Sequence, residues 1–333
     1  MNIQKPYLLF LGDAHDQLAA KVADGIKQWH PEYCVGQYRM AECHADCHVP
    51  DMDINAAVKA GAKTLVVGVA NRGGVISPAW GSILSQALES GLDLAAGLHN
   101  KLADVPELKA LADRLGRSLF DVRHPTQHYP VASGRKRSGK RLLPVGTDCS
   151  CGKMYTALAI EKAILARGGK ATFRATGQTG ILISGSGVSI DAVVSDFVSG
   201  AVETLSPDND ADHWDIIEGQ GSLFHPSFAG VTTGLIHGAQ PDALVLCHEP
   251  TRTHMRGVDY PIPDLSDCMA LSLKMAQLTN PHARFVGVSV NTAALDEAQA
   301  CALMDALQQR LGLPVVDPFR QGVGAIVDAL AAL

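Results

Sequence analysis

The sequence predicts an α/β protein with two domains, a Rossmann-like N-terminal domain followed by a P-loop domain with a parallel sheet. Its 333 residues are enough for about two domains of roughly 150 residues each. Strand-like apolar runs alternate with helix-like segments, a pattern typical of parallel sheets with crossover helices. Residues 131–140 (VASGRKRSGK) are basic and rich in glycine and serine, which indicates a linker. The predicted domains are therefore residues 1–130 and 138–333.

Composition limits the function classes. The 28 basic and 34 acidic side chains give a net charge of −6, and without a long basic run this argues against a nucleic-acid-binding protein. No apolar run reaches the roughly 18 residues of a membrane span. The short apolar run Tyr7–Leu11 indicates a first strand and not a signal peptide. We expect a cytoplasmic protein without membrane or nucleic-acid partners.

The cysteines do not indicate a disulfide framework or a structural metal. Eight in 333 residues are too sparse for a disulfide-rich fold. The densest cluster, residues 43–48 (CHADCH), has metal-binding side chains, but its spacing matches no common zinc pattern. We expect a polar loop with reduced thiols there, and no metal requirement.

In the N-terminal part, the alternation predicts four strands and two helices. Ser77 fits a helix N-cap and Pro78 the first helical position. The expected strands are Tyr7–Leu11, Thr64–Val69, Gly91–Leu94 and Ser118–Asp121, and the expected helices are Asp16–Trp29 and one that begins near Ser77.

The C-terminal part repeats the α/β alternation. Its expected strands are Arg141–Val145, Ala171–Ala175, Trp214–Ile217, Ala243–Cys247, Arg284–Val290 and Pro314–Val316. Its expected helices are Gly152–Arg167, Ile190–Leu205, Ser266–Gln277, Leu295–Leu311 and Val323–Leu330.

The strongest motif is a glycine-rich loop between a strand and a helix. It comprises Gly146, Thr147, Asp148, Cys149, Ser150, Cys151, Gly152 and Lys153. In such a P-loop, backbone N–H groups and the lysine bind phosphate oxygens at the N-terminus of the helix. Nucleotide-hydrolysing enzymes carry Ser or Thr after the lysine as a Mg²⁺ ligand, whereas this chain has Met154. The loop therefore predicts binding of a pyrophosphate more than hydrolysis of ATP.

Polar residues at other strand ends suggest the rest of an active site. Residues 173–180 leave a strand on glycine and hydroxyl side chains, and Glu218 follows the apolar strand 214–217. Ligands of open α/β sheets bind at the carboxyl ends of the strands. Asp191 follows a Gly-Ser-Gly run and is a second candidate for a catalytic carboxylate. An acidic residue that stabilises a helix N-terminus explains its position equally well.

The loop G-T-D-x-x-x-G-K, the later E-G-x-G and the V-x-V-N ending at Asn291 resemble the dethiobiotin synthetase-like P-loop proteins, in which threonine takes the place of Met154. Over nearly its full length, the chain looks like a member of the D-glutamate N-acetyltransferase family, a two-domain P-loop family. The motifs shared with that family are Val69–Gly74, Gly146–Lys153, Arg174–Gly180, Ile183–Asp191, Asp215–Ser222 and His248–Arg252.

The resemblance implies transfer of an acetyl group from acetyl-CoA to D-glutamate, as the first step of its catabolism. A pathway partner would then be an N-acetyl-glutamate racemase, and we expect a homodimer or a larger homo-oligomer. The loop Gly146–Lys153 would bind the phosphates of coenzyme A.

Our own placement of the catalytic groups makes Glu218 the leading general base, with His254 and Asp191 as alternatives. The other interpretation of His254, and the one we favour, is a solvated loop histidine. For the substrate carboxylates we expect three guanidinium groups that lie near strand ends, although surface ion pairs would also explain them. These are Arg72, Arg174 and Arg252.

Two other function classes remain open. An ATP-dependent ligase or kinase of the dethiobiotin synthetase type is supported by Asp148, Lys153 and Glu218, but Met154 speaks against it. A nucleotide or coenzyme sensor would bind its ligand without turnover. The number of polar groups at several strand ends favours an enzyme over a sensor.

Overall fold

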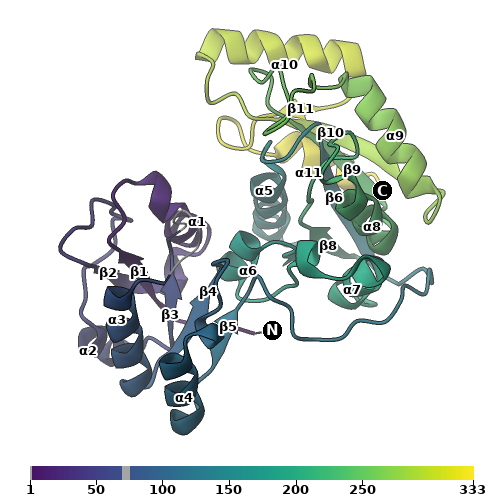
Figure 1. Ribbon diagram of the computed structural model, residues 1–333. Helices are drawn as coiled ribbons and strands as arrows, with labels where there is room; N and C mark the ends of the chain where they lie inside the picture. The colour runs from purple at the N-terminus through teal and green to yellow at the C-terminus, as the bar shows by residue number, and fades with distance from the viewer. Residues whose placement is uncertain (1, 70–75) are drawn as a thin grey trace. The chain divides into compact units, whose positions relative to one another are not determined.

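The computed structural model describes residues 2–69 and 76–333, and the chain divides into two compact units. The first unit contains the chain up to Gln127 together with Gly177–Ala192. The second contains His128–Thr176 and Val193–Leu333. Each unit is built on one purely parallel sheet (Figure 1). Within the described residues, every helix is too short or too polar to cross a membrane.

The first unit has a five-stranded sheet in the order β2-β1-β3-β4-β5. Its strands are β1 (Tyr7–Gly12), β2 (Cys34–Arg39), β3 (Thr64–Val67), β4 (Asp93–Ala96) and β5 (Leu119–Asp121). Its larger helices are α1 (Lys21–Trp29), α2 (Ile54–Lys59), α3 (Pro78–Glu89), α4 (Pro106–Leu115) and α6 (Gln178–Ser184). As predicted, α3 begins after Ser77, whose hydroxyl accepts a hydrogen bond from the Trp80 N–H.

Helix α6 comes from the later part of the chain but packs with the first unit, mainly against α1. Its apolar residues Ile181, Leu182 and Ile183 are fully buried. The Lys5 ammonium donates to the Ser184 carbonyl at 2.9 Å, and Ile3 N donates to the Gly185 carbonyl at 2.8 Å. The single boundary near residues 130–138 that the sequence suggested therefore does not describe residues 177–192, because this segment buries its apolar face against the N-terminal half.

The second unit has a six-stranded sheet in the order β11-β10-β9-β6-β8-β7. Its strands are β6 (Lys140–Gly146), β7 (Lys170–Arg174), β8 (His213–Ile217), β9 (Ala243–His248), β10 (Arg284–Val290) and β11 (Val315–Val316). Its helices are α5 (Lys153–Ala166), α7 (Val198–Leu205), α8 (Ala229–Ala239), α9 (Leu265–Gln277), α10 (Glu297–Leu311) and α11 (Gly324–Ala331). All the strands predicted for this part are present within one or two residues.

The predicted helix Ile190–Leu205 is wrong as one element. The structure has a 3-10 turn at Ile190–Ala192, another at Ser195–Phe197 and then α7. The helical spacing of apolar residues there is misleading, because Ile190 is buried in the first unit and Val198 in the second. Val194, between them, has an extended backbone and a side chain that faces solvent.

Helix α8 packs closely on α7 through a row of glycines. An added Cβ at Gly234 would lie 2.7 Å from Val198 Cγ1, and one at Gly238 would lie 2.4 Å from the Ser199 carbonyl oxygen. The Ser199 hydroxyl donates to the Gly234 carbonyl at 2.8 Å. These glycines allow the two helices to approach, and they also explain why the sequence did not indicate a helix here, since glycine is a poor helix former.

This packing predicts different effects of the same substitution at two glycines of α8. We expect Gly238→Ala to lower the free energy of unfolding by about 1–3 kcal/mol, because Ser199 backbone atoms cannot yield to the new methyl group. Gly230→Ala, where nothing lies within 4 Å, should change it by less or raise it by up to about 1 kcal/mol. Urea unfolding of both variants checks this, and equal effects would contradict it.

Candidate active site

The candidate site lies at the carboxyl ends of three neighbouring strands, β9, β6 and β8. Strand β6 ends at Gly146 and leads through the loop 147–152 into α5. Strands β8 and β9 end at Ile217 and His248, and because all three strands are parallel their ends meet at one edge of the sheet. Glu218 and the residues after His248 are thereby brought to the glycine-rich loop.

The loop needs glycine at its first and last positions. A Cβ at Gly146 would lie 2.6 Å from Cys151 Sγ and 2.9 Å from Lys153 Nζ, so only glycine lets the loop close over itself. Gly152 has φ +104°, a left-handed value that other residues rarely adopt, and it is the N-cap of α5. Ser150 also has a positive φ, +52°. The predicted strand, loop and helix are therefore all present.

Lys153 is a buried cation without an acidic partner. Its side chain is only 6% exposed. Its Nζ donates to the Asp148 carbonyl oxygen at 2.7 Å and lies 3.7 Å from Cys151 Sγ. Among the described residues, no carboxylate lies within 4 Å of this ammonium group. Since a buried charge is costly unless it is paired, the arrangement favours an anionic ligand.

Backbone donors of the loop add to this anion site. Within the described part of the chain, the N–H groups of Ser150, Cys151 and Gly152 donate no hydrogen bond. They precede the N-terminus of α5, where the helix dipole also favours negative charge. Free N–H groups, a helix N-terminus and a buried ammonium together form a binding site for phosphate groups.

Asp148 connects the loop to the segment that follows β9. Its fully buried carboxylate accepts hydrogen bonds from Arg252 Nη1 at 2.6 Å and from Arg256 N at 2.8 Å. Burial acts to raise the pKa of Asp148, but the hydrogen bonds from Arg252, Arg256 and Cys149 outweigh it and hold the pKa below its usual value. The carboxylate is therefore ionised at neutral pH and fixes the loop to the segment after β9.

Arg252 braces the same loop. Besides Asp148, its guanidinium donates to the carbonyls of Cys149 at 2.7 Å and Ser150 at 3.3 Å, and it pairs with Glu249. The next residues form a short hairpin, in which Met255 N donates to the Tyr260 carbonyl at 2.7 Å. The side chain that we expected to bind substrate therefore holds the phosphate loop in place.

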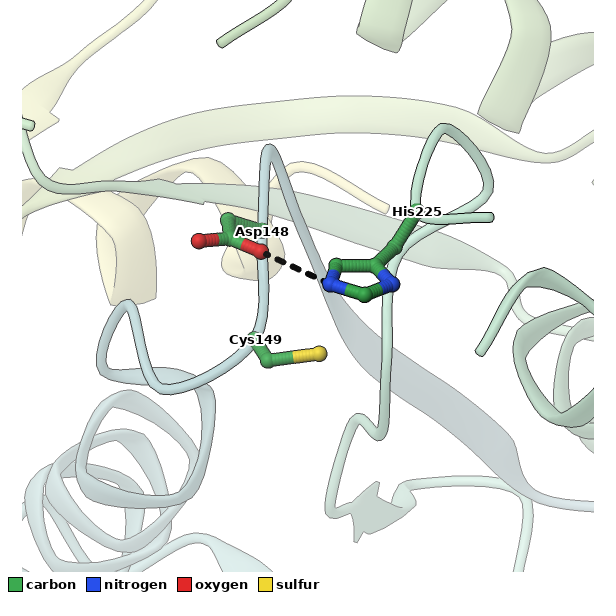
Figure 2. Close-up of side chains that lie close together, drawn as sticks. All are labelled: Asp148, Cys149 and His225. Carbon is green, nitrogen blue, oxygen red and sulfur yellow. Dashed lines mark ion pairs between the residues drawn. The ribbon is translucent and has the colours of Figure 1, made fainter. Parts of the chain in front are cut away.

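Asp148, Cys149 and His225 offer three potential metal ligands within 4.8 Å of one another (Figure 2). The Ser227 N–H donates to His225 Nδ1 at 3.2 Å, so the neutral ring carries its proton on Nε2. This Nε2 faces the Arg256 carbonyl at 3.1 Å and Asp148 Oδ1 at 4.0 Å. Burial raises the pKa of the Cys149 thiol, so the thiol is protonated at neutral pH.

Glu218 lies directly after β8 and is buried. Its Oε2 accepts a hydrogen bond from Thr176 N at 2.8 Å, and the Thr176 hydroxyl donates to its backbone carbonyl at 2.7 Å. The next residue, Gly219, packs on the P-loop so closely that a Cβ there would lie 2.9 Å from Lys153 Cδ. Glu218 therefore lies at the same edge of the sheet as the lysine of the loop, and its carboxylate is held by Thr176.

His248 also belongs to this site and was missed as a site residue in the sequence. Its Nδ1 lies 3.1 Å from the Thr147 hydroxyl, and its ring is half-buried at the end of β9. Burial, aided by the charge of Arg252, lowers the pKa of His248 to about 4, so the ring is neutral at neutral pH. The sequence held one indication of this role, because His248 is the last residue of an apolar strand.

The other predicted site residues lie elsewhere or are paired. Arg174 ends β7, and its Nε donates to the buried Asp215 carboxylate at 2.8 Å. His254 is exposed on the hairpin, and its Nε2 lies 3.8 Å from an Asp259 carboxylate oxygen. Asp191 belongs to the first unit, where it accepts from the Ser189 hydroxyl at 2.9 Å. Arg72 lies outside the described residues.

The Asp148 anchor predicts a pH-dependent loss of stability. We expect Asp148→Asn to cost about 2–4 kcal/mol at pH 7, because it removes a buried carboxylate from charge-assisted hydrogen bonds. Since the folded-state pKa is lowered, this contribution is complete above the unfolded value of about 3.9 and disappears as the pH falls through the folded value.

Unfolding of wild type and Asp148→Asn between pH 3 and 8 measures this difference, which should shrink below about pH 4. The exposed Asp208, paired with Arg135, provides the control, because Asp208→Asn should cost much less at every pH. A difference between wild type and Asp148→Asn that does not change with pH would contradict the assignment.

Comparison with known proteins covers both units. The P-loop domain model of a domain of unknown function, DUF1611_C, matches residues 130–327, and the Rossmann-like DUF1611_N model matches residues 34–125. A crystal structure of a DUF1611 family protein from Anabaena variabilis ATCC 29413 is 33% identical, covers 99% of this chain and 100% of its own, and has a TM-score of 0.84. The predicted fold class is confirmed.

Two curated relatives span the whole chain. A D-glutamate N-acetyltransferase of Tritonibacter scottomollicae is 59% identical over 332 residues, which are 99% of this chain and 100% of the relative. A D-glutamate N-acetyltransferase of a Pseudoalteromonas species is 50% identical over 331 residues, again 99% and 100%. The family resemblance inferred from the sequence is confirmed. The chain therefore belongs to the two-domain DUF1611 family and is a full-length relative of the D-glutamate N-acetyltransferases.

Proposed function

We propose that this protein transfers the acetyl group of acetyl-CoA to the amine of D-glutamate, the activity that names its two curated relatives. The observation that carries the proposal is the buried Lys153, which lacks an acidic partner among the described residues and lies beside free loop N–H groups. Coenzyme A contains a pyrophosphate that such a site fits. The acetyl donor would thus be bound by a phosphate site used for anchoring alone.

Met154 explains why a coenzyme suits this loop better than a magnesium nucleotide. It occupies the position directly after Lys153, in the first turn of α5. A thioether is a poor ligand for a hard cation such as Mg²⁺, for which P-loop enzymes use a hydroxyl at this point. Binding of the coenzyme A pyrophosphate by N–H groups and an ammonium needs no such ligand. We therefore propose acetyl transfer that requires no metal.

Glu218 is the group that we propose as general base. The amine of D-glutamate is protonated in solution and becomes a nucleophile only after it loses a proton. Glu218 lies at the strand end beside the phosphate loop, and the Thr176 N–H fixes one of its carboxylate oxygens. In the overall reaction, an N–C bond forms at the acetyl carbonyl carbon, the thioester C–S bond breaks, and the coenzyme thiol leaves with a proton.

The two carboxylates of D-glutamate need cationic partners. We propose Arg174, which ends β7 next to the strand that positions Glu218. Arg252 would act indirectly, since its guanidinium is used to hold the loop. His254 and Asp191 remain alternatives as bases, although the structure gives both of them partners outside the phosphate loop.

We further propose a cytoplasmic homodimer or larger homo-oligomer whose product is taken up by an N-acetyl-glutamate racemase. Support for the location comes from the eight cysteines, all of which are described and free. Reduced thiols are the rule in the cytoplasm. Oligomers of enzymes are commonly symmetric, which supports the assembly.

The activity is tested by release of free thiol from acetyl-CoA in the presence of D-glutamate, L-glutamate or no amino acid, with and without Mg²⁺. We expect thiol release that depends on D-glutamate and persists when EDTA removes divalent cations. The reason is that Met154, which follows Lys153, has no hydroxyl group to bind Mg²⁺. Mass spectrometry should identify N-acetylglutamate as the product.

Thiol release with L-glutamate but not with the D-isomer would contradict the proposed substrate. Absence of release under every condition, combined with Mg²⁺-dependent ATP turnover, would overturn acetyl transfer in favour of a ligase or kinase. Binding of acetyl-CoA without turnover of any amino acid would indicate a sensor.

Replacing the proposed base tests its role separately. Glu218→Gln keeps the size of the side chain and an oxygen for the Thr176 N–H, so we expect the fold to persist. Turnover should fall by about 100- to 10,000-fold, while the affinity for acetyl-CoA stays within about threefold. Glu203→Gln, which changes a carboxylate that caps the linker at Ser133 and Gly134, is the control and should retain activity. A wild-type rate in Glu218→Gln would exclude Glu218 as the base.

A further inference from the structure

Two aromatic side chains, the half-buried Tyr155 and the exposed Phe319, pack against each other beside the start of α5. Tyr155 lies two residues after Lys153, and its ring packs edge-on against Phe319 with a centroid distance of 5.5 Å and an interplanar angle of 64°. The Phe319 side chain is 59% exposed, although burial of a phenylalanine ring normally contributes to stability. Neither ring has a role in the site described above.

The exposed ring is held by a rigid support. Asp317, which is buried, accepts hydrogen bonds from Thr292 N at 2.9 Å, from the Thr292 hydroxyl at 2.5 Å and from Phe319 N at 2.9 Å. Arg320 Nε donates to the same Thr292 hydroxyl at 2.8 Å. The segments after β10 and β11 are thereby tied together, so Phe319 is presented to solvent by a fixed backbone.

The pair also lies on the side of the sheet where the phosphates would bind. Strands β10 and β11 are parallel to β6, so their carboxyl ends share the edge that carries the phosphate loop. Tyr155 lies two residues after Lys153 in the first turn of α5, about 3 Å along the helix axis and about 200° around it. Since the pyrophosphate would bind at the N-terminus of this helix, a group as long as an adenosine that is joined to it can extend to the ring in the first turn and to its neighbour Phe319.

We propose that Tyr155 and Phe319 form the binding platform for the purine base of coenzyme A. This inference rests on the proposed function and deepens it, because it assigns the adenosine end of the acetyl donor. A purine is flat and stacks on aromatic rings, whereas D-glutamate and the pantetheine arm contain no aromatic group that would use such a surface. The platform would separate the base from the reacting thioester and leave the strand ends around Glu218 to the substrate.

Binding of coenzyme A and of adenosine 3′,5′-bisphosphate to wild type and variants, measured by calorimetry, tests the platform. We expect Phe319→Ala to weaken both ligands by about 5- to 100-fold and Phe319→Trp to stay within about threefold of wild type. Phe319→Leu keeps an apolar side chain without a ring and should resemble Phe319→Ala. Leu278→Ala, which removes another exposed apolar side chain at the end of α9, should bind normally.

A donor without adenosine gives a readout that a structural defect would not produce. With acetyl-CoA as donor, Phe319→Ala should raise KM by the same factor and leave kcat within about twofold. With S-acetyl-4′-phosphopantetheine, which keeps a phosphate but lacks the base, wild type and Phe319→Ala should have equal kcat/KM. Equal losses with both donors would overturn the platform.

The outcomes also separate this inference from the proposed function. If wild type binds and uses acetyl-CoA but Phe319→Ala does so equally well, the platform is wrong and the acetyltransferase stands. If Phe319→Ala weakens ATP but not coenzyme A, the platform serves a nucleotide, which contradicts our assignment. If wild type neither binds nor uses acetyl-CoA, the proposed function fails, and the platform for its adenosine fails with it.

Discussion

The hydrogen-bonded ion pair between Asp148 and Arg252 determines the shape of the phosphate site. It joins the middle of the loop after β6 to the segment after β9, and Arg252 also holds two loop carbonyls. With those carbonyls turned toward the guanidinium, the N–H groups of residues 150–152 remain available on the other side of the loop. The buried charge of Lys153 is tolerable only within such a preformed environment. A single carboxylate thus organises both the backbone and the charge of the site.

Much of the fold was predictable because strands and helices of a parallel sheet leave strong local patterns. Strands β6 and β9 at the centre of the second sheet are almost fully buried apolar runs, and Ser77 marks the start of α3 by a local hydrogen bond. The sequence also left β2, α2, α4 and α6 unpredicted, and two further failures have a non-local cause. Helix α8 depends on close packing against α7 at Gly234 and Gly238. The segment 190–198 is divided between the cores of the two units. Neither fact can be read from periodicity, which reports only that one face is apolar.

The candidate site shows the same division. The loop and Glu218 were predictable, because glycine, lysine and a carboxylate at strand ends carry their meaning locally. The role of Arg252 was not, since the sequence says nothing about its contact with Asp148, which is 104 residues away. His248 was missed because a histidine that ends a strand has no local mark of its pKa. Long-range partners therefore decide which cations are available to a substrate and which are already used by the protein.

Residues 177–192 belong to the first unit although they follow part of the second unit in the chain, and this has a consequence for the evolution of the family. The chain passes from one unit to the other more than once, so neither unit is a continuous piece of the gene. A duplication or recombination event that breaks the gene in the linker would separate α1 from α6, and would leave the apolar residues Ile181, Leu182 and Ile183 without their core. The two halves are therefore expected to be inherited together, and new specificities to arise by point substitution within this architecture and not by exchange of domains.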